Sequence, residues 1–236
     1  MNDDTYMPPA QGTWSFHDPA VASLFDKMLP LSIPDYSTMR WLTTNLALND
    51  LDEVPVIADL GSSRGDAIAP IAVARPLGHF HLWEQSIPMQ NVLNDRFQYN
   101  RNVTVHGEDL RDEAFVSSHF DRVLSVLTLM FIPVEYRASV LARIHNSLRP
   151  NGVFFLVEKT LQENEKTSRA FTKEYYAMKS RNGYSDEQIE RKRLSLEGVL
   201  VPLPMSTNEQ MLRHAGFSHI ECYWKALHFT GWMAYK

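Results

Sequence analysis

The sequence is poor in the residues that mark several classes of protein. Its 236 residues include one cysteine, Cys222, which excludes a disulfide within the chain and a cysteine-ligated zinc cluster. No apolar run nears the roughly 20 residues that span a bilayer, and the first residues lack the apolar core of a signal peptide. With 23 basic and 28 acidic residues, the chain has no dense Lys/Arg cluster. We expect a cytoplasmic protein without direct membrane or nucleic acid binding, and a buried Cys222.

Short β-branched or aromatic runs alternate with amphipathic segments from about residue 54 onward, which is typical of a parallel sheet wrapped by helices. The predicted strands are Val54–Asp59, Phe80–Glu84, Val103–Gly107, Phe120–Leu127, Val153–Glu158, His219–Leu227 and Phe229–Tyr235. The last two nearly touch in sequence, so they form an antiparallel pair, because a parallel crossover needs a dozen or more residues. This pattern predicts an α/β, Rossmann-like class I methyltransferase fold, with a seven-stranded, mostly parallel sheet, an antiparallel closing pair and a helical cap.

Two segments lie outside the predicted sheet. Residues 1–50 are expected to be N-terminal cap helices around Pro30 and Pro34, and residues 51–236 the methyltransferase domain, with a helical insertion at about 160–200. Within the insertion, Ser185 and Gln188 form a capping box that predicts a helix beginning at Asp186. We expect both segments to cover the ligand-binding face of the sheet.

The loop after the first predicted strand carries the main cofactor signal. Asp59, Gly61, Ser63 and Gly65 stand at alternate positions, whereas a dinucleotide fingerprint needs glycines at the first, third and sixth positions. Gly61 would let the backbone approach S-adenosylmethionine, Gly65 would allow tight entry into a helix, and Asp59 would anchor the ammonium group of the ligand. A strand, turn and helix with two glycines also occur without any ligand, so this loop alone leaves both interpretations open.

Acidic residues follow the next two predicted strands. Glu84 stands about twenty residues beyond the loop, where doubly wound folds place the carboxylate that accepts the ribose hydroxyls. Asp109, within Glu108–Leu110, follows the third strand, where a carboxylate lies near the adenine amino group. Each could be a solvated loop charge, but three carboxylates at one edge of a sheet favour a ligand site. The histidines show no metal-ligand spacing, so we predict no metal.

The segment after the fourth predicted strand argues against base methylation. DNA amino-methyltransferases place an Asp-Pro-Pro-Tyr-like turn there to hold a flipped base. This chain has Thr128–Phe131 instead. Cytosine C5 methylation needs a cysteine nucleophile after the same strand, and Cys222 is far away in the closing pair.

Several longer stretches resemble one enzyme family over most of the chain. They are NGYSDEQIERKRLSLEGVL from Asn182, LRHAGFSHIECYWKALHFTGWMAYK at the C-terminal end, FHDPAVASLFDKMLPLSIPDYS from Phe16, and the shorter DLGSSRG, EDLRD, LTLMF and LVEK. The chain thereby resembles carboxy-S-adenosylmethionine synthases, which transfer a carboxyl group from prephenate to S-adenosylmethionine and form dimers. The resemblance implies a cofactor pocket lined by Tyr36, Gly61, Ser62, Ser63, Glu84, Gln85, Asp109 and Leu110.

The same resemblance assigns Arg193 to the extra carboxylate of the carboxylated cofactor, and makes Arg193 and Tyr36 the candidate catalytic residues. The chain departs from the family at two positions beside the cofactor, where Val126 replaces an asparagine and Met130 a glutamine. Both changes remove polar groups next to the sulfonium. They favour methyl transfer in place of carboxyl transfer.

Helix geometry gives a prediction for Arg193 that does not depend on the family resemblance. At about 100° per residue its side chain lies within roughly 40° of the apolar stripe of Ile189, Leu196 and Leu200, so we expect its stem to point inward. Its partner is then Glu190 or Glu197 on the same helix, or a ligand carboxylate. The aromatic residues that could close the site, or simply pack in the core, are Trp14, Phe16, Tyr36, Tyr175 and Tyr176.

These patterns lead to three hypotheses. The first is a transferase that uses S-adenosylmethionine, leaves S-adenosylhomocysteine and acts on a small, anionic molecule, in a chain that forms a homodimer. The second is the synthase itself, which would make carboxy-S-adenosylmethionine from prephenate. The third is a non-catalytic protein that binds S-adenosylmethionine.

Overall fold

One mixed sheet forms the centre of the molecule. The computed structural model describes residues 15–112 and 120–236. Its strands are β1 (Val56–Leu60), β2 (His79–Trp83), β3 (Val103–His106), β4 (Phe120–Val126), β5 (Leu148–Leu161), β7 (His219–Ala226) and β8 (Phe229–Tyr235), in the order β3-β2-β1-β4-β5-β8-β7. Strands β1 to β5 are parallel, and β8 is antiparallel to both β5 and β7. The predicted α/β fold with its antiparallel closing pair is confirmed.

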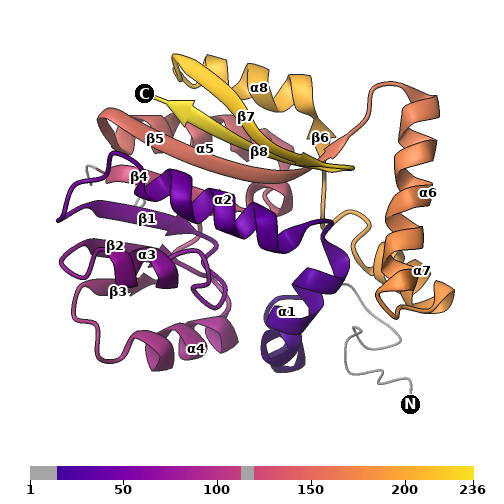
Figure 1. Cartoon of the computed structure of the whole chain (residues 1–236), viewed down its shortest axis with the longest axis horizontal. Coiled ribbons are helices and arrows are strands. Elements are labelled where there is room, and N and C mark those ends of the chain that lie inside the picture. The colour runs from indigo at the N-terminus through magenta and orange to yellow at the C-terminus, as the bar shows by residue number, and fades with distance from the viewer. Residues whose placement is uncertain (1–14, 113–119) are drawn as a thin grey trace.

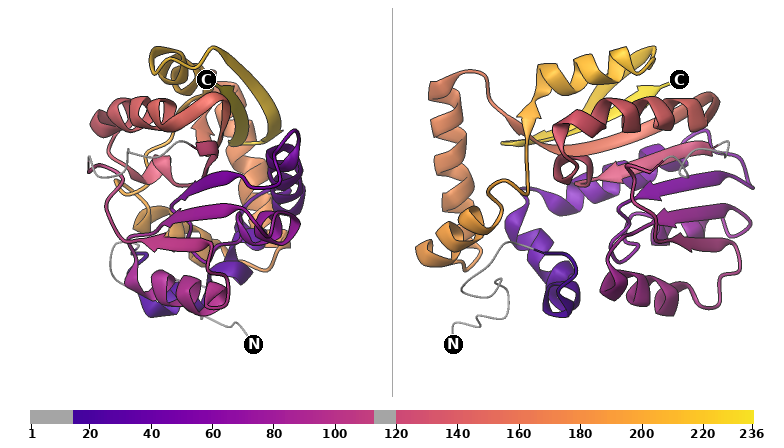
Figure 2. Two further views of the ribbon diagram at one scale, coloured as in Figure 1. Left: turned by 90° about the vertical axis from the view of Figure 1, so that its left-hand side faces the viewer. Right: turned by 180° about the vertical axis from the view of Figure 1, so that it is seen from behind.

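Helices cover both faces of the sheet (Figures 1 and 2). On one face, α5 (Val134–Ser147) and α8 (Met205–His214) bury Ile144 and Leu212 against Phe154 and Trp232. On the other face lie α2 (Tyr36–Leu48), α3 (Ala69–Ala74) and α4 (Ile87–Phe97), whose apolar side chains pack on β1, β2 and β4. The two apolar layers fix the sheet, and therefore fix where the ends of its strands point.

Three more helices, α1 (Pro19–Ser32), α6 (Glu165–Arg181) and α7 (Asp186–Ser195), stand beyond one end of the sheet (Figures 1 and 2). Asp18 caps α1 by accepting a hydrogen bond from the amide of Ala20 at 2.9 Å. The helix predicted to begin at Asp186 is confirmed, with the capping box between Ser185 and Gln188. The short 3-10 helix η3 (Leu129–Phe131) follows β4 at the same end of the sheet.

Two expectations differ from the structure. Strand β5 is longer than the predicted Val153–Glu158 at both ends. Leu148 at its beginning pairs with Phe120 of β4, and Thr160 and Leu161 at its end pair with β6 (Leu203–Pro204), a two-residue strand that has no sequence signal of its own. Cys222 is exposed, so the prediction that it is buried is wrong. It lies on β7 at the edge of the sheet, beside the register shift between Cys222 and Trp224, where one face of the strand meets solvent.

Within the described parts of the chain, no helix is long and apolar enough to cross a bilayer. Residues 15–112 and 120–236 also contain no group of three or more His, Cys, Asp or Glu side chains arranged to hold a metal ion.

Candidate functional site

A cavity of about 410 Å³ opens at the carboxyl ends of β1, β2, β4 and β5, under α1, α6 and α7. Of the residues predicted to bind the cofactor, those that line it are Tyr36, Asp59, Gly61, Ser62, Ser63, Glu84, Gln85, Asp109, Leu110 and Val126. Gly65 and Arg193 are not among the lining residues. The cavity therefore gathers, from five separate segments of the chain, nearly all of the residues that the sequence pointed to.

The two loop glycines serve different purposes. Gly61 has φ +72°, and a Cβ there would lie 2.3 Å from Cγ2 of Thr128, so the loop can approach the turn after β4 this closely only with glycine at this position. Gly65 has φ +78°, and a Cβ there would lie 2.6 Å from the ring of Phe97 and 2.9 Å from Leu93 on α4. Gly61 thus shapes the cavity wall, whereas Gly65 allows the next helical segment to pack tightly.

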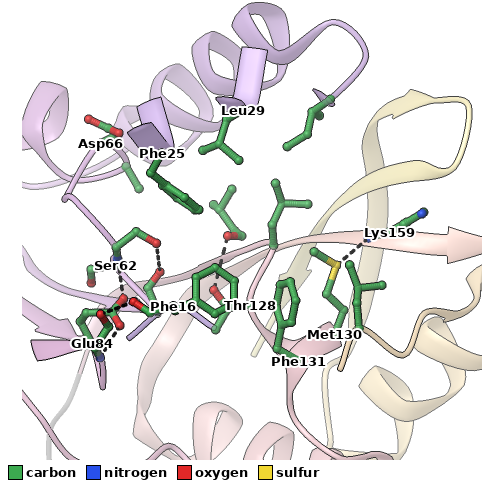
Figure 3. Close-up of a pocket in the computed structure, with 18 of the residues that line it drawn as sticks. Phe16, Phe25, Leu29, Ser62, Asp66, Glu84, Thr128, Met130, Phe131 and Lys159 are labelled. Carbon is green, nitrogen blue, oxygen red and sulfur yellow. Dashed lines mark hydrogen bonds between the residues drawn. The ribbon is translucent and has the colours of Figure 1, made fainter. Parts of the chain in front are cut away.

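Glu84 is held in place by backbone amides at the end of β2. Its Oε2 accepts from the amide of Ser63 and its Oε1 from the amide of Ser86, both at 2.8 Å (Figure 3). Burial raises the pKa of the carboxyl group, although the two amides oppose that shift. Each oxygen retains a lone pair, so the fixed carboxylate can accept two further donors, as a pair of vicinal ribose hydroxyls requires.

Asp59 and Arg40 leave unpaired polar atoms at the same end of the cavity. Asp59 is 2% exposed, and its Oδ2 is buried without a hydrogen-bond partner in the described part of the chain. Burial raises the pKa of Asp59 to about 7, against the opposing effect of Arg40. Nη2 of Arg40, on α2, is likewise buried without a partner. An orphaned acceptor beside an orphaned donor matches the ammonium and carboxylate of an amino acid.

Arg40 was missed at the sequence level. It stands in the middle of a helix, where an arginine normally faces solvent. The one signal that could have found it is its helical spacing from Tyr36, one turn earlier, because both residues then lie on one face of α2.

The residues after β3 form the next part of the wall. Both carboxylate oxygens of Asp109 accept from Nε of Arg111, at 3.0 and 2.9 Å, and this ion pair lowers the pKa of Asp109 to about 2. Leu110 is buried and presents an apolar surface, and the side chain of Gln85 hydrogen-bonds Asp109. An ionised acceptor beside an apolar side chain matches an adenine ring with its amino group.

A buried acid, Glu158, lies beside the turn after β4. It is 2% exposed, and its Oε1 has no hydrogen-bond partner in the described part of the chain. Burial raises the pKa of Glu158 to about 8, although Arg137 and the amides of Thr128, Leu129 and Met130 oppose that shift. Met130 and Phe131, in η3 after this turn, line the cavity.

Three lysines line the far side of the same cavity. They are Lys159 on β5, Lys179 on α6 and Lys192 on α7. Figure 3 shows Lys159 and Met130 at the opposite end of the drawn residues from Glu84 and Ser62. Sequence reasoning missed all three lysines, because they come from three elements that pattern alone does not bring together.

Arg193 does not take the predicted orientation. It is exposed, and its guanidinium donates to Glu190 at 2.8 Å from Nε and 2.7 Å from Nη2, with Glu197 3.7 Å from Nη1. The prediction that the stem of Arg193 points inward is wrong, because the buried face of α7 is centred on Gln188, Lys192 and Ser195. Arg193 lies about 100° around the helix from Lys192.

The candidate aromatic residues divide into three groups. Phe16, Tyr36 and Tyr175 line the cavity, and burial raises the pKa of Tyr36. Tyr176 packs near Tyr175 but is not among the lining residues. Trp14 lies outside the described residues.

Comparisons with known proteins bear on the family and the fold. Residues 57–152 match the family model of a methyltransferase domain. The carboxy-S-adenosyl-L-methionine synthase of Nautilia profundicola is 30% identical over 100% of both chains, and that of Helicobacter hepaticus is 32% identical over 93% of both. Among solved structures, a putative O-methyltransferase from Nostoc punctiforme has a TM-score of 0.66 at 15% identity, covering 95% of this chain and 62% of the other.

A second solved structure, human N-acetylserotonin methyltransferase in complex with S-adenosylmethionine, has a TM-score of 0.62 at 14% identity, covering 94% of this chain and 57% of that one. At such identities the structures support the fold alone, whereas the full-length relatives identify the family. The chain therefore belongs to the carboxy-S-adenosyl-L-methionine synthase-like family of class I, S-adenosylmethionine-dependent methyltransferase-type enzymes.

Proposed function

We propose that the chain is a transferase that binds S-adenosylmethionine at the Glu84 end of the cavity and acts on a small, anionic molecule. The observation that carries this proposal is the pair of buried, unpartnered atoms, Asp59 Oδ2 and Arg40 Nη2, beside the positioned carboxylate of Glu84. Asp59 would hold the ammonium group of the ligand, Arg40 its carboxylate, and Glu84 the ribose hydroxyls.

The remaining predicted residues would complete the cofactor site. Asp109, Leu110 and Gln85 would surround the adenine ring. Gly61, Ser62 and Ser63 would provide the backbone surface, and Tyr36 and Val126 would flank the methionine portion. Gly65 supports this loop from outside through α4.

When bound, S-adenosylmethionine supplies an electrophilic carbon on its sulfonium. The residues of this chain then orient an acceptor in line with that carbon and exclude water, which is most of what such a transfer requires. Phe16, Phe131 and Tyr175 line the cavity with apolar rings, so they favour exclusion of water. No acid–base triad is needed for this role.

Titration calorimetry with S-adenosylhomocysteine tests the cofactor proposal. We expect saturable binding at one site per chain, and we expect Asp59→Ala to weaken it by about tenfold or more, because the ligand ammonium loses a charged partner. A wild-type protein that binds no S-adenosylhomocysteine would contradict the proposal. Native mass spectrometry of the same sample reports the subunit count, for which we propose a homodimer.

A second candidate is synthesis of carboxy-S-adenosylmethionine from S-adenosylmethionine and prephenate. The full-length relatives, which are carboxy-S-adenosyl-L-methionine synthases, favour it. In this reaction Arg193 is proposed to bind the added carboxylate, for which its guanidinium must leave Glu190 and Glu197. Incubation with both substrates should yield a nucleoside heavier by the mass of CO₂. Its absence, alongside normal cofactor binding, leaves methyl transfer as the better proposal.

A non-catalytic role is the third candidate, and the apolar Val126 and Met130 favour it. Met130 faces the cavity with a thioether that accepts from the amide of Lys159 at 3.4 Å. Trapped S-adenosylhomocysteine after incubation with S-adenosylmethionine and candidate acids would exclude this role. Binding without any turnover would support it.

A further inference from the structure

The first half of helix α1 forms a wall of the cavity without being part of the sheet core. Phe25 and Met28 line the cavity from this helix, and Figure 3 shows Phe25 and Leu29 pointing into it. The buried residues of this half pack with Met89 of α4 in a small apolar cluster, separate from the two layers that cover the sheet. The position of this half therefore depends strongly on its polar contacts.

Arg64, in the loop after β1, ties the first half of α1 to that loop. Its Nε lies 2.7 Å from Oδ2 of Asp26, and its Nη1 donates to the carbonyl of Ala22 at 2.9 Å. Asp66, which accepts from Arg96 at 2.5 Å, lies near Asp26 as well. Burial raises the pKa of Asp26, and Asp66 adds to this shift while Arg64 opposes it. Arg64 thus supplies the positive charge between the loop and the helix.

The residues that hold α1 are neighbours of those that hold Glu84. Ser63, directly before Arg64, donates its amide to the carboxylate of Glu84, and Ser86 donates its own amide to the same group. The hydroxyl of Ser86 also donates to the carbonyl of Phe16, just before α1, at 2.5 Å. Both segments that hold Glu84 therefore also hold α1, which couples a ligand on Glu84 to the position of the helix.

The second half of α1 is anchored elsewhere. The side-chain amide of Asn182 donates to the carbonyl of Leu31 at 3.0 Å, and the hydroxyls of Ser32 and Tyr184 lie 3.1 Å apart. Pro30, inside the helix, has no N–H, so one helical hydrogen bond between the two halves is missing. The helix therefore has a weak point between its anchored end and the end tied to the loop after β1.

We propose that the first half of α1 is a lid over the bound cofactor, and that Arg64 is the positioning residue that closes it. This inference rests on the proposed function. For the cofactor to enter or leave, the lid moves about Pro30 and the contact between Arg64 and Asp26 breaks. The side chains of Arg64 and Asp26 are 23% and 45% exposed, so water can replace their contact and the lid opens reversibly.

The rate at which S-adenosylhomocysteine dissociates from the full chain tests the lid. Stopped-flow tryptophan fluorescence can follow it, because Trp83 lines the cavity. Arg64→Ala should raise the dissociation rate constant about fivefold or more without lowering the association rate constant, because a charged contact that holds the lid is lost. Asp26→Ala leaves the loop intact and should also raise the dissociation rate constant. The double variant should fall short of the product of the two single effects, because both remove the same ion pair.

Two variants serve as controls. Arg169→Ala removes an exposed arginine whose ion pair with Glu165 lies within α6, and it should release S-adenosylhomocysteine as wild type does. Arg64→Lys keeps the charge and should restore part of the slow dissociation. Hydrogen exchange gives an independent readout of the helix itself. S-adenosylhomocysteine should slow exchange at the amides of residues 21–29 in wild type, and much less in Arg64→Ala.

Three results would overturn the lid. One is the same dissociation rate constant in wild type, Arg64→Ala and Asp26→Ala. Another is slower association with unchanged dissociation in Arg64→Ala, which would show damage to the loop in place of release of the helix. A third is a double variant whose effect equals the product of the single effects, which would exclude a shared contact. Failure of S-adenosylhomocysteine to bind wild type overturns the proposed function instead.

Discussion

The two ends of the cavity are built in different ways. At the proposed cofactor end, Asp59, Gly61 and Glu84 stand where β1 and β2 finish, and the backbone amides of Ser63 and Ser86 hold the carboxylate of Glu84. At the basic end, Lys159, Lys179 and Lys192 project from a strand and two separate helices, and aromatic rings surround two of them. The strands of the sheet therefore fix the positions of the residues at the proposed cofactor end, whereas the positions of the lysines at the basic end also depend on how α6 and α7 pack.

The strand ends that form one end of the cavity are common to open α/β sheets, whereas the helices that form the other end differ between such proteins. Ligands of open α/β sheets bind beyond the carboxyl ends of the strands, whatever reaction follows. Specificity for the second substrate depends on elements added around that edge. In this chain those elements are α1, α6 and α7, and α6 and α7 each add one lysine to the cavity wall, Lys179 and Lys192, beside Lys159 of β5.

Glu84→Ala should have the largest effect and should be confined to the cofactor end. Loss of a carboxylate that accepts two hydroxyls is expected to lower the affinity for S-adenosylhomocysteine by on the order of 100-fold. Calorimetry measures this, and Glu53→Ala, an exposed acid near the other end of β1, is the matched control. Unchanged affinity in Glu84→Ala would remove the carboxylate from the cofactor site.

The two glycine variants sharpen the comparison within the loop. Gly65→Ala should lower the free energy of unfolding by about 1 to 3 kcal/mol through overpacking against Phe97 and Leu93, with little change in cofactor affinity. Gly61→Ala should lower both the free energy of unfolding and the cofactor affinity. Adding Thr128→Ala to Gly61→Ala should recover part of both losses, because the closest contact is removed. Urea unfolding and calorimetry measure the two quantities. Equal effects on cofactor affinity at both glycines would contradict the assignment.

The two ends should also give opposite pH dependence of stability in the ligand-free protein. Burial raises the pKa of Asp59 to about 7, so the folded chain holds a proton that the unfolded chain has lost, and stability falls from roughly pH 4 to 7. Burial and Lys179 lower the pKa of Lys192 to about 5, so the unfolded chain binds the extra proton, and stability rises from about pH 5 toward 10.

Urea unfolding across this range, with one variant for each end, separates the two contributions. Asp59→Asn should abolish the fall that ends near pH 7, and Lys192→Met should abolish the rise that begins near pH 5. Wild-type slopes retained in both variants would show that other groups control the pH dependence.

Arg193→Ala should have the smallest effect on stability and on cofactor affinity. Its ion pairs with Glu190 and Glu197 are exposed and contribute little to stability, and its side chain does not line the cavity. We expect the affinity for S-adenosylhomocysteine to stay within about twofold by calorimetry. A larger loss would require Arg193 to reach the cofactor in a different arrangement of α7.

The sequence could predict the sheet, and the residues that gather at the Glu84 end of the cavity, because the relevant signals are local. Strand periodicity, the position of the glycines and the acids at strand ends each lie within a few residues of the feature they describe. Arg40, Lys179 and Lys192 could not be found in this way, because their burial depends on contacts between α2, α6, α7 and the sheet. The orientation of Arg193 was wrongly predicted for a related reason. A shift of one residue along α7 separates the buried position of Lys192 from the exposed position of Arg193.

A crystal structure with S-adenosylhomocysteine tests the proposed cofactor site most directly. The account predicts ribose hydroxyls on Glu84, the ammonium group on Asp59 and the nucleoside carboxylate on Arg40, away from Lys159, Lys179 and Lys192. A nucleoside bound with its carboxylate on the lysines, or lying away from Glu84, would contradict it.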